Sequence, residues 1–158
     1  MDAGDRALWD GDQDERPLSD LGRKQASALA SVMGNAGITA LWASPALRAR
    51  ETLDPLAKKL GLEIVTIASL AERRPGESDT AMAQRGERGL DEMRRRTARG
   101  VAVAASHGDI IPAAIDRIAR RRGLRPGWIE QRGQWFAVSF GADLGVTIEL
   151  CEAPGFPQ

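Results

Sequence analysis

Apolar residues recur along much of the chain at the three-to-four-residue spacing of a helix. This spacing predicts helices over residues 19–33, 47–60 and about 79–99, and over a segment that starts near Asp109 and continues to Ile118. Ser19 is a suitable N-cap for the first helix, and Gly61 is expected to end the second. Pro55 predicts a kink or a restart within the second helix, with Asp54 as the new cap.

Continuous apolar runs between these helices predict short buried strands at residues 38–43, 63–67 and 101–105. Residues 101–105 are small and apolar throughout, as in a parallel strand covered on both faces. Two further strands are expected at Gln134–Phe140 and Val146–Cys151, joined by a turn at 141–145. Strands that alternate with helices predict an α/β domain with a mostly parallel sheet and an antiparallel edge.

Length and composition indicate one globular domain over residues 1–158. Hydrophobic residues make up 42% of the chain and charged residues 28%, which excludes fibrous and wholly disordered proteins. The 22 basic and 22 acidic side chains balance, so no overall charge attracts the chain to nucleic acid or to an anionic membrane. The polar residues 2–18 are expected to form a loop.

Cysteine and histidine each occur once, as Cys151 and His107. One cysteine cannot form an internal disulfide, and one histidine with one cysteine cannot complete a zinc site of the Cys/His kind. The acidic start of the chain does not resemble a signal peptide, and no apolar run approaches the length that spans a membrane. We therefore expect a cytoplasmic protein without a metal.

The segment Ser106-His107-Gly108-Asp109 lies where an apolar strand gives way to a helix. In open α/β sheets, ligands bind beyond the carboxyl ends of the strands, and the N–H groups of a helix N-terminus favour an anion there. Gly108 would let the backbone approach such a ligand, and Asp109 can cap the helix. The same pattern also fits a structural histidine in a tight turn.

Two more charged residues follow strands and are candidates for the same crevice. Arg48 falls in the first turn of the second helix, where its guanidinium could hold a phosphate through two parallel hydrogen bonds. Glu72 could reach the crevice as a general acid. The alternatives are a solvated helix charge for Arg48 and a surface ion pair with Arg73 or Arg74 for Glu72.

Arginine runs at 94–96 and 120–122 raise the hypothesis of nucleic-acid binding. Aromatic residues are few, the charges balance and no nucleic-acid motif is present, so these runs are interpreted as solvated helix faces. Trp42, Trp128 and Trp135 are expected in the core or at its rim. Trp9 stands alone in a polar loop, where covering a binding site is an alternative role.

Four segments together resemble the histidine phosphatase superfamily, which includes the phosphoglycerate mutases. They are the run from Arg16-Pro17-Leu18 to Ala26, the run from Ser44-Pro45 to Thr52, Leu70-Ala71-Glu72, and the run from Ser106-His107 to Pro112. They occur in the family's order and extend over most of the chain. The chain is most similar to small phosphohistidine phosphatases and to phosphatase domains joined to Nudix hydrolases, which share Ala3-Gly4-Asp5-Arg6.

The resemblance implies a three-layer α/β sandwich and a phosphatase that needs no metal or cofactor. In the family, a histidine in an Arg-His motif at the end of the first strand takes the phosphoryl group, inside a clamp of cationic side chains. By resemblance, Arg48 takes the role of the second arginine and His107 that of the second histidine. Gly108 belongs to the same phosphate-binding turn, and Glu72 is the candidate proton donor.

The chain departs from the family at its start. It has no Arg-His pair, and Met1 aligns immediately after the position of the nucleophile. The apolar first strand, which lies inside the family's sheet, is therefore missing too, and its loss would leave a slot flanked by unpaired backbone groups.

Three explanations compete for this departure: a shortened form of an active enzyme, a degenerate pseudo-phosphatase that binds phosphorylated ligands, or a chain in which His107 replaces the nucleophile. We favour the first, because the remaining motifs are intact. The expected partner is a phosphorylated small molecule or phosphoprotein, with no nucleic acid and no membrane. The sequence does not indicate an oligomeric state.

Overall fold

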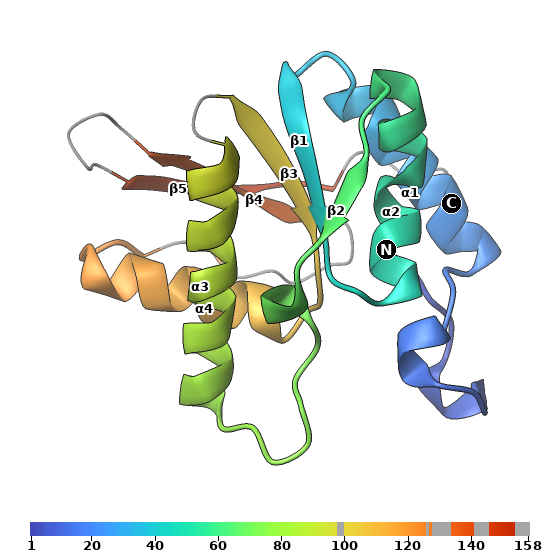
Figure 1. Cartoon of the computed structure of the whole chain (residues 1–158), viewed down its shortest axis with the longest axis horizontal. Helices are drawn as coiled ribbons and strands as arrows, with labels where there is room; N and C mark the ends of the chain where they lie inside the picture. Colours follow the sequence, from blue (N-terminus) through green and yellow to red (C-terminus); the bar gives the residue numbers. More distant parts are fainter. Residues whose placement is uncertain (98–99, 126, 128–133, 141–145, 154–158) are drawn as a thin grey trace.

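A computed structural model describes residues 1–97, 100–125, 127, 134–140 and 146–153 of the chain. Figure 1 shows its helices and strands. In chain order the elements are η1 (Arg6–Leu8), η2 (Gln13–Glu15), α1 (Asp20–Met33), β1 (Ile38–Ala43), α2 (Leu47–Leu60), β2 (Ile64–Thr66), η3 (Ala68–Leu70), α3 (Asp79–Thr97), β3 (Val101–Ala105), α4 (Ile110–Arg121), β4 (Trp135–Phe140) and β5 (Val146–Cys151).

Three strands form a parallel sheet in the order β2-β1-β3. The register pairs Trp42 with Val65 on one side and with Ala104 on the other. β4 and β5 pair with each other in the antiparallel sense, and the predicted turn between them lies outside the described residues. The prediction of an α/β domain with a mostly parallel sheet is confirmed. The predicted antiparallel edge of that sheet is wrong among the described strands, because β4 and β5 pair only with each other and form a separate sheet.

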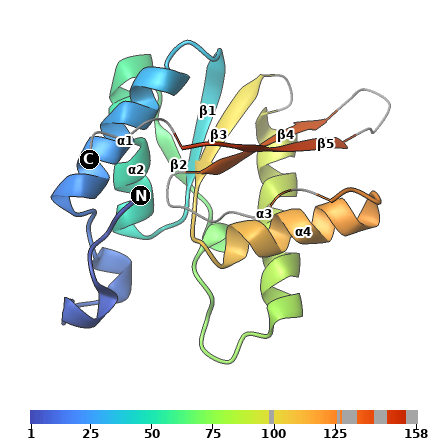
Figure 2. The same cartoon turned by 180° about the vertical axis from the view of Figure 1, so that it is seen from behind.

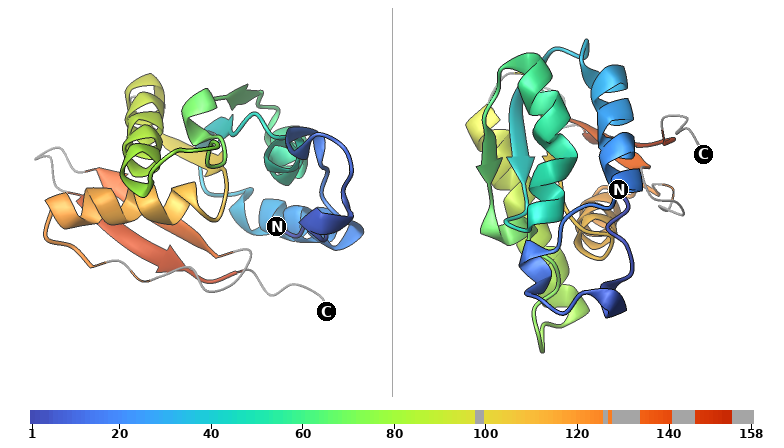
Figure 3. Two further views of the ribbon diagram at one scale, coloured as in Figure 1. Left: turned by 90° about the horizontal axis from the view of Figure 1, so that it is seen from below. Right: turned by 90° about the vertical axis from the view of Figure 1, so that its right-hand side faces the viewer.

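Side chains of the parallel strands alternate between two apolar layers. One cluster joins Leu41 of β1 to Leu29 of α1 and Leu53 of α2. The opposite face of β1 contributes Trp42 to a second cluster, which contains Met93 of α3. Because successive strand residues point to opposite faces, the sheet is covered by α1 and α2 on one side and by α3 on the other. Figure 3 shows this sandwich from two further directions.

The two sheets are separate, and the β4–β5 pair runs across the direction of the parallel strands in Figures 1 and 2. Among the described strands, β3 pairs only with β1, and β4 pairs only with β5. Val101 at the start of β3 and Phe140 at the end of β4 are each 44% exposed. Residues 102–105 nevertheless pack on both faces of the sheet, as predicted: Ala102 and Ala104 pack against the cluster of Trp42, and Val103 and Ala105 pack in the cluster of Leu41.

Two helices continue through residues that predicted a break. α2 is a single helix with Pro55 inside it, so the predicted restart at Asp54 does not occur. α3 continues through Gly86 and Gly89, where a Cβ would come within 3 Å of side-chain atoms of α4 and η3. Glycine at these positions allows close packing, which offsets its low helix propensity.

Helix ends follow the predicted chemistry. The Ser19 side chain accepts a hydrogen bond from the backbone N–H of Gly22, and Asp109 accepts one from Ile110. Gly61 ends α2 with a φ of 67°, a conformation that favours glycine. These caps satisfy backbone groups that the helices leave unpaired.

The arginine runs lie on exposed helix faces, as the sequence predicted. Arg120 pairs with Asp116, and Arg121 pairs with Glu87 across the α3–α4 contact. The Arg96 guanidinium lies 4.5 Å from the ring centroid of the buried Trp42. The described runs are thus engaged in local ion pairs and in a cation–π contact.

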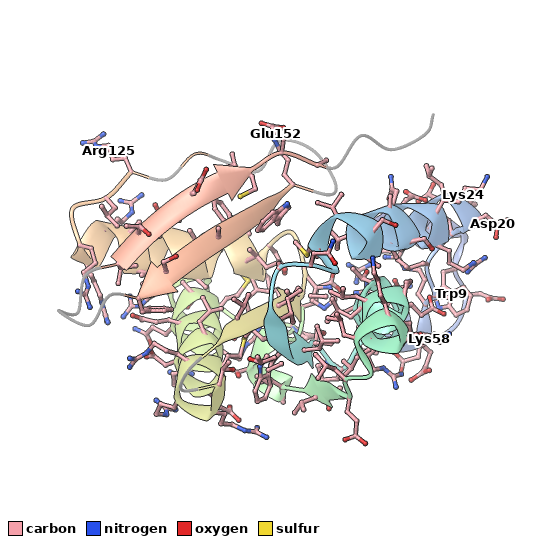
Figure 4. The ribbon with its side chains drawn as sticks, turned by 90° about the horizontal axis from the view of Figure 1, so that it is seen from above. Trp9, Asp20, Lys24, Lys58, Arg125 and Glu152 are labelled. Carbon is pink, nitrogen blue, oxygen red and sulfur yellow. The ribbon has the colours of Figure 1, made fainter. Side chains whose placement is uncertain are left out.

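Trp42 is buried, Trp135 is half-buried, and Trp128 lies outside the described residues. The indole N–H of Trp9 donates to the carbonyl of Asp12 at 2.8 Å within its own loop. Figure 4 shows Trp9 at the end of the molecule that holds α1 and α2, far from Arg125 and Glu152 beside the hairpin. In the described part of the chain, no helix combines the length and the apolar character that crossing a membrane requires.

A buried ion pair fastens α3 to the loop before it. The Arg85 guanidinium donates to both carboxylate oxygens of Glu77, with distances of 2.7 Å from Nε and 2.6 Å from an Nη atom. These hydrogen bonds hold the pKa of Glu77 well below its ordinary value, at about 2. A carboxyl group whose pKa is lowered in the folded state stabilises that state above its unfolded pKa.

We expect the free energy of unfolding of the Glu77→Gln variant to depend less on pH in the acid range than that of the wild type. In the wild type, the stabilisation from Glu77 is complete above about pH 4.5 and is lost as pH falls towards 2. Urea unfolding at several pH values between 2 and 6 measures the effect. A variant whose free energy of unfolding falls across this window as steeply as that of the wild type would contradict the assignment.

Candidate functional site

The candidate site lies at the carboxyl ends of the parallel strands, at the lower end of the molecule in Figure 1. Ser44 follows β1 directly, and its backbone N–H donates to the carbonyl of Ala105 at the end of β3 at 2.9 Å. His107 comes two residues after β3. Parallel pairing therefore brings two segments that are distant in sequence to one edge of the sheet.

Both ring nitrogens of His107 have partners. Nε2 lies 2.7 Å from the hydroxyl of Ser44, and Nδ1 lies 3.2 Å from an Nη atom of Arg48. A guanidinium can only donate, so Nδ1 is the acceptor and the ring proton is assigned to Nε2, which donates to Ser44. His107 is thus a neutral imidazole held in one orientation.

Burial lowers the pKa of His107 below its ordinary value of 6.5, and the neighbouring positive charge of Arg48 lowers it further. Glu72, Asp109 and Asp14 act in the opposite direction. His107 is only 7% exposed, so desolvation of a charged imidazolium is the main cause. The neutral form is therefore favoured near neutral pH.

Arg48 lies in the first turn of α2 and is buried. One terminal nitrogen donates to the backbone carbonyl of Gln13 at 2.6 Å. The other donates to the Glu72 carboxylate at 3.0 Å and contacts His107. The alternative that Arg48 is a solvated helix charge is thus excluded. The contact with Gln13 also shows that the N-terminal loop lies against the site.

Glu72 pairs with Arg48 and not with its sequence neighbours. Its side chain is 29% exposed, and the same carboxylate oxygen lies 3.7 Å from the Arg6 guanidinium. Arg73 instead pairs with Asp79. The structure therefore brings Arg48, Glu72 and His107 together, and solvent can reach the carboxylate.

Gly108 is exposed, and a Cβ on it would meet no other atom within 4 Å. The following residue, Asp109, caps α4 and also accepts a hydrogen bond from the backbone N–H of Arg73 at 2.9 Å. The turn after β3 thus leaves open space next to Gly108, and its role in holding a ligand stays a prediction.

Three contributors were not among the candidates drawn from the sequence. Ser44 carried a usable signal, because it ends a buried strand at the same edge as His107. Arg6 belongs to the Ala3-Gly4-Asp5-Arg6 segment of the resemblance, but nothing in the sequence indicated that it lies near Glu72. Gln13 acts through a backbone carbonyl, which every residue has, so its identity carried no signal.

The arrangement can hold an anion by charge and by hydrogen bonding. Arg48 supplies two terminal nitrogens, and Glu72 can carry a proton to or from a bound group. Among the described residues, no three His, Cys, Asp or Glu side chains lie close enough together to bind a metal ion.

Comparison with known families and curated proteins agrees with the resemblance in the motifs. Residues 5–77 match the family model of the Histidine phosphatase superfamily (branch 1). This range contains Arg48 and Glu72 and ends before His107. The chain is also 33% identical over 124 residues to an 8-oxo-(d)GTP phosphatase of Mycolicibacterium smegmatis. That match covers 78% of this chain but only 37% of the relative's length.

Solved structures agree in fold. A mycobacterial glucosyl-3-phosphoglycerate phosphatase in complex with inorganic phosphate superposes with a TM-score of 0.71, at 20% identity, covering 91% of this chain and 90% of that one. A phosphoserine phosphatase from Entamoeba histolytica in complex with 3-phosphoglyceric acid gives a TM-score of 0.67, at 15% identity, covering 84% and 82%. Similarity at these identities establishes the shared fold.

The single histidine allows a direct test of the site's electrostatics. We expect nuclear magnetic resonance titration of the imidazole to give a pKa below 6.5, because burial and Arg48 both disfavour the charged form. The Arg48→Gln variant should raise this pKa by removing the adjacent cation. A wild-type pKa at or above 6.5, or no rise in the variant, would contradict the geometry described.

Proposed function

Because the chain has the histidine phosphatase fold and matches the branch 1 family model over residues 5–77, we propose that its full-length form is a phosphatase. It hydrolyses a phosphomonoester or a phosphohistidine through a phosphohistidine intermediate. The observation that carries this proposal is the contact between Arg48 and His107 at the carboxyl edge of the sheet. Two groups suited to hold phosphate oxygens lie side by side there.

The proposed reaction has two displacements. A histidine nitrogen, supplied by the strand absent from this chain, attacks phosphorus while the bond to the leaving oxygen breaks, and protonated Glu72 transfers its proton to that oxygen. Water then attacks the phosphohistidine and gives a proton back to Glu72, which releases inorganic phosphate and regenerates the histidine. Arg48 stabilises the phosphoryl oxygens in both steps, and the Nε2–H of His107 donates to them once it leaves the Ser44 hydroxyl.

The divided sheet supports the interpretation of a shortened enzyme. β3 has no second partner among the described strands, and the β4–β5 pair stands apart from it. A further strand paired in parallel with β3 would carry its last residues to the edge where His107 lies. Residues 1–158 would then form a single histidine phosphatase domain from which that N-terminal strand is missing.

A phosphate must displace protein groups to reach Arg48. The two terminal nitrogens already donate to Gln13 and Glu72, and the second of them also contacts His107. Protonation of Glu72 would weaken its hold on Arg48 and remove repulsion between the carboxylate and the phosphate. The same proton that the leaving group needs therefore also favours binding.

A substitute-nucleophile role for His107 is disfavoured by its contacts. The proton on Nε2 and the hydrogen bond from Arg48 to Nδ1 leave neither ring nitrogen with a free lone pair. The pseudo-phosphatase alternative keeps the anion site but needs no nucleophile. It is favoured over a shortened enzyme only if the DNA upstream of Met1 encodes no in-frame apolar strand ending in Arg-His.

The relatives indicate which substrates to test. The names of similar proteins include an 8-oxo-(d)GTP phosphatase, a glucosyl-3-phosphoglycerate phosphatase and a phosphoserine phosphatase. We therefore propose a phosphorylated small molecule or a phosphoprotein as the substrate. The panel to test contains phosphorylated nucleotides, sugar phosphates, phosphoamino acids and phosphohistidine protein. The cytoplasmic location stays a prediction.

The 158-residue chain should bind orthovanadate or inorganic phosphate but turn over p-nitrophenyl phosphate little or not at all. Replacement of Arg48 by methionine should weaken anion binding about tenfold or more, because a charged hydrogen-bonding group is lost. Titration monitored by the His107 resonances measures the affinity. Robust turnover that is abolished by His107→Ala would overturn the prediction of a missing nucleophile.

An extended chain tests the missing strand directly. Addition of an N-terminal apolar strand that ends in Arg-His immediately before Met1 should create p-nitrophenyl phosphatase activity. The matched control carries the same strand with alanine in place of the added histidine, and it should fold equally well and remain inactive. Equal activity of the two extended chains would exclude the phosphohistidine mechanism.

A further inference from the structure

Arg85 is the most completely paired charged side chain close to the candidate site. It lies on α3, is 4% exposed, and directs its guanidinium at the loop that carries Glu72. One terminal nitrogen donates to the carbonyls of Ser69 and Ala71 at 3.0 Å and 2.8 Å, and the other donates to the carbonyl of Glu72 at 3.2 Å. Three main-chain groups within four residues are thus held by one side chain.

Glu77 completes this arrangement. Its two carboxylate oxygens accept from Nε and from the second terminal nitrogen of Arg85, as described above. Guanidinium hydrogen bonds have a fixed planar geometry, so a bidentate carboxylate fixes the plane in which the carbonyls must lie. A lysine in place of Arg85 would keep the charge but could not form this fork.

The Glu72 side chain itself makes no hydrogen bond to Arg85. Its carboxylate contacts Arg48 and Arg6, while its backbone carbonyl is the group that Arg85 holds. The hydroxyl of Ser106 adds a second anchor by donating to the carbonyl of Leu70 at 2.6 Å. The main chain of residues 69–72 is therefore held from α3 and from the turn after β3.

We propose that Arg85 is a positioning residue for the candidate site: it fixes the main chain of residues 69–72 and thereby presents the Glu72 carboxylate to Arg48. The inference rests on the proposed function for its chemical meaning, since Glu72 is the proton donor there. The effect of Arg85 on the position of Glu72 does not depend on catalysis. We call the hydrogen bonds of Arg85 to the carbonyls of residues 69, 71 and 72 the Arg85 clamp. Loss of this clamp should move Glu72 away from Arg48 and His107 even where no phosphate binds.

His107 reports the position of Glu72 without an activity assay. The charged groups that act on its imidazole are Arg48 from α2, Glu72 from the loop after η3, Asp109 at the start of α4 and Asp14 in η2. The Glu72 carboxylate raises the pKa of His107, so withdrawal of this carboxylate lowers it. Since the chain contains one histidine, its resonances are unambiguous.

The test is a double-mutant cycle on the full 158-residue chain, with the His107 pKa measured by nuclear magnetic resonance. Arg85→Lys keeps the charge of residue 85, so a change in the pKa reports displacement rather than lost charge. We expect Arg85→Lys and Glu72→Gln each to lower the His107 pKa. The double variant should show no larger shift than Glu72→Gln alone, because both changes remove the same carboxylate.

Glu87→Gln is the matched control. Glu87 also lies on α3 and accepts from two arginines, Arg117 at 2.6 Å and Arg121 at 2.7 Å, but it pairs with α4 and not with the Glu72 loop. This variant should leave the His107 pKa unchanged. Two results would overturn the positioning role. One is a His107 pKa in the Arg85→Lys variant equal to that of the wild type, and the other is a shift in the double variant equal to the sum of the two single shifts.

Two further measurements separate the possible failures. If the Arg85→Lys variant does not fold, the Glu77→Gln variant takes its place in the same cycle. Glu77→Gln weakens the hydrogen bonds that orient the Arg85 guanidinium and leaves the contacts of Arg85 with the carbonyls available. Full additivity with Glu72→Gln again overturns the proposal. Titration of each folded variant with inorganic phosphate tests the proposed function separately. Absence of phosphate binding in wild type would contradict the anion site while leaving the positioning result intact.

Discussion

The parallel pairing of β1 with β3 determines where the chemical groups of this protein meet. The register places Ala43 opposite Ala105, so the residues that follow each strand emerge next to one another. Ser44 then reaches His107, and α2, which begins at Leu47, carries Arg48 to the other side of the imidazole. Because both strands run in the same direction, polar residues from distant segments converge on one edge of an otherwise apolar sheet.

The other edge of β3 sets a second constraint. A strand inside a sheet satisfies its backbone groups on both sides, whereas β3 is paired only with β1 among the described strands. The half-exposed side chains of β3 and the exposed Phe140 of β4 show that apolar surface remains where the two sheets separate. An additional strand at this place would cover that surface and bring new residues to the His107 edge.

The charge state of His107 is set by the charged side chains next to it and by its burial, and not by the net charge of the chain. His107 is buried beside the cationic Arg48, and Glu72 offsets part of that positive charge from the exposed side. Arg85 acts at greater distance, through backbone carbonyls and not through direct contact with the Glu72 carboxylate. Burial, assisted by Arg48, therefore favours the neutral form of His107, while Arg85 contacts the main chain that carries Glu72 from behind the site.

Local sequence patterns predicted the elements because helix and strand signals depend on residues a few positions apart. They placed β1, β3 and β5 at the observed bounds, identified Ser19 and Asp109 as caps, and selected Arg48, Glu72 and His107 as candidates for one crevice. They were wrong on the helix restart at Pro55 and on an antiparallel edge of the parallel sheet, where packing against other elements decides. The contact of Ser44 with His107 joins residues 63 positions apart, and the contact of Arg48 with Gln13 uses a backbone carbonyl. Only the tertiary structure decided these contacts and the Arg85 clamp, because they depend on how distant segments approach and not on the residues beside them in sequence.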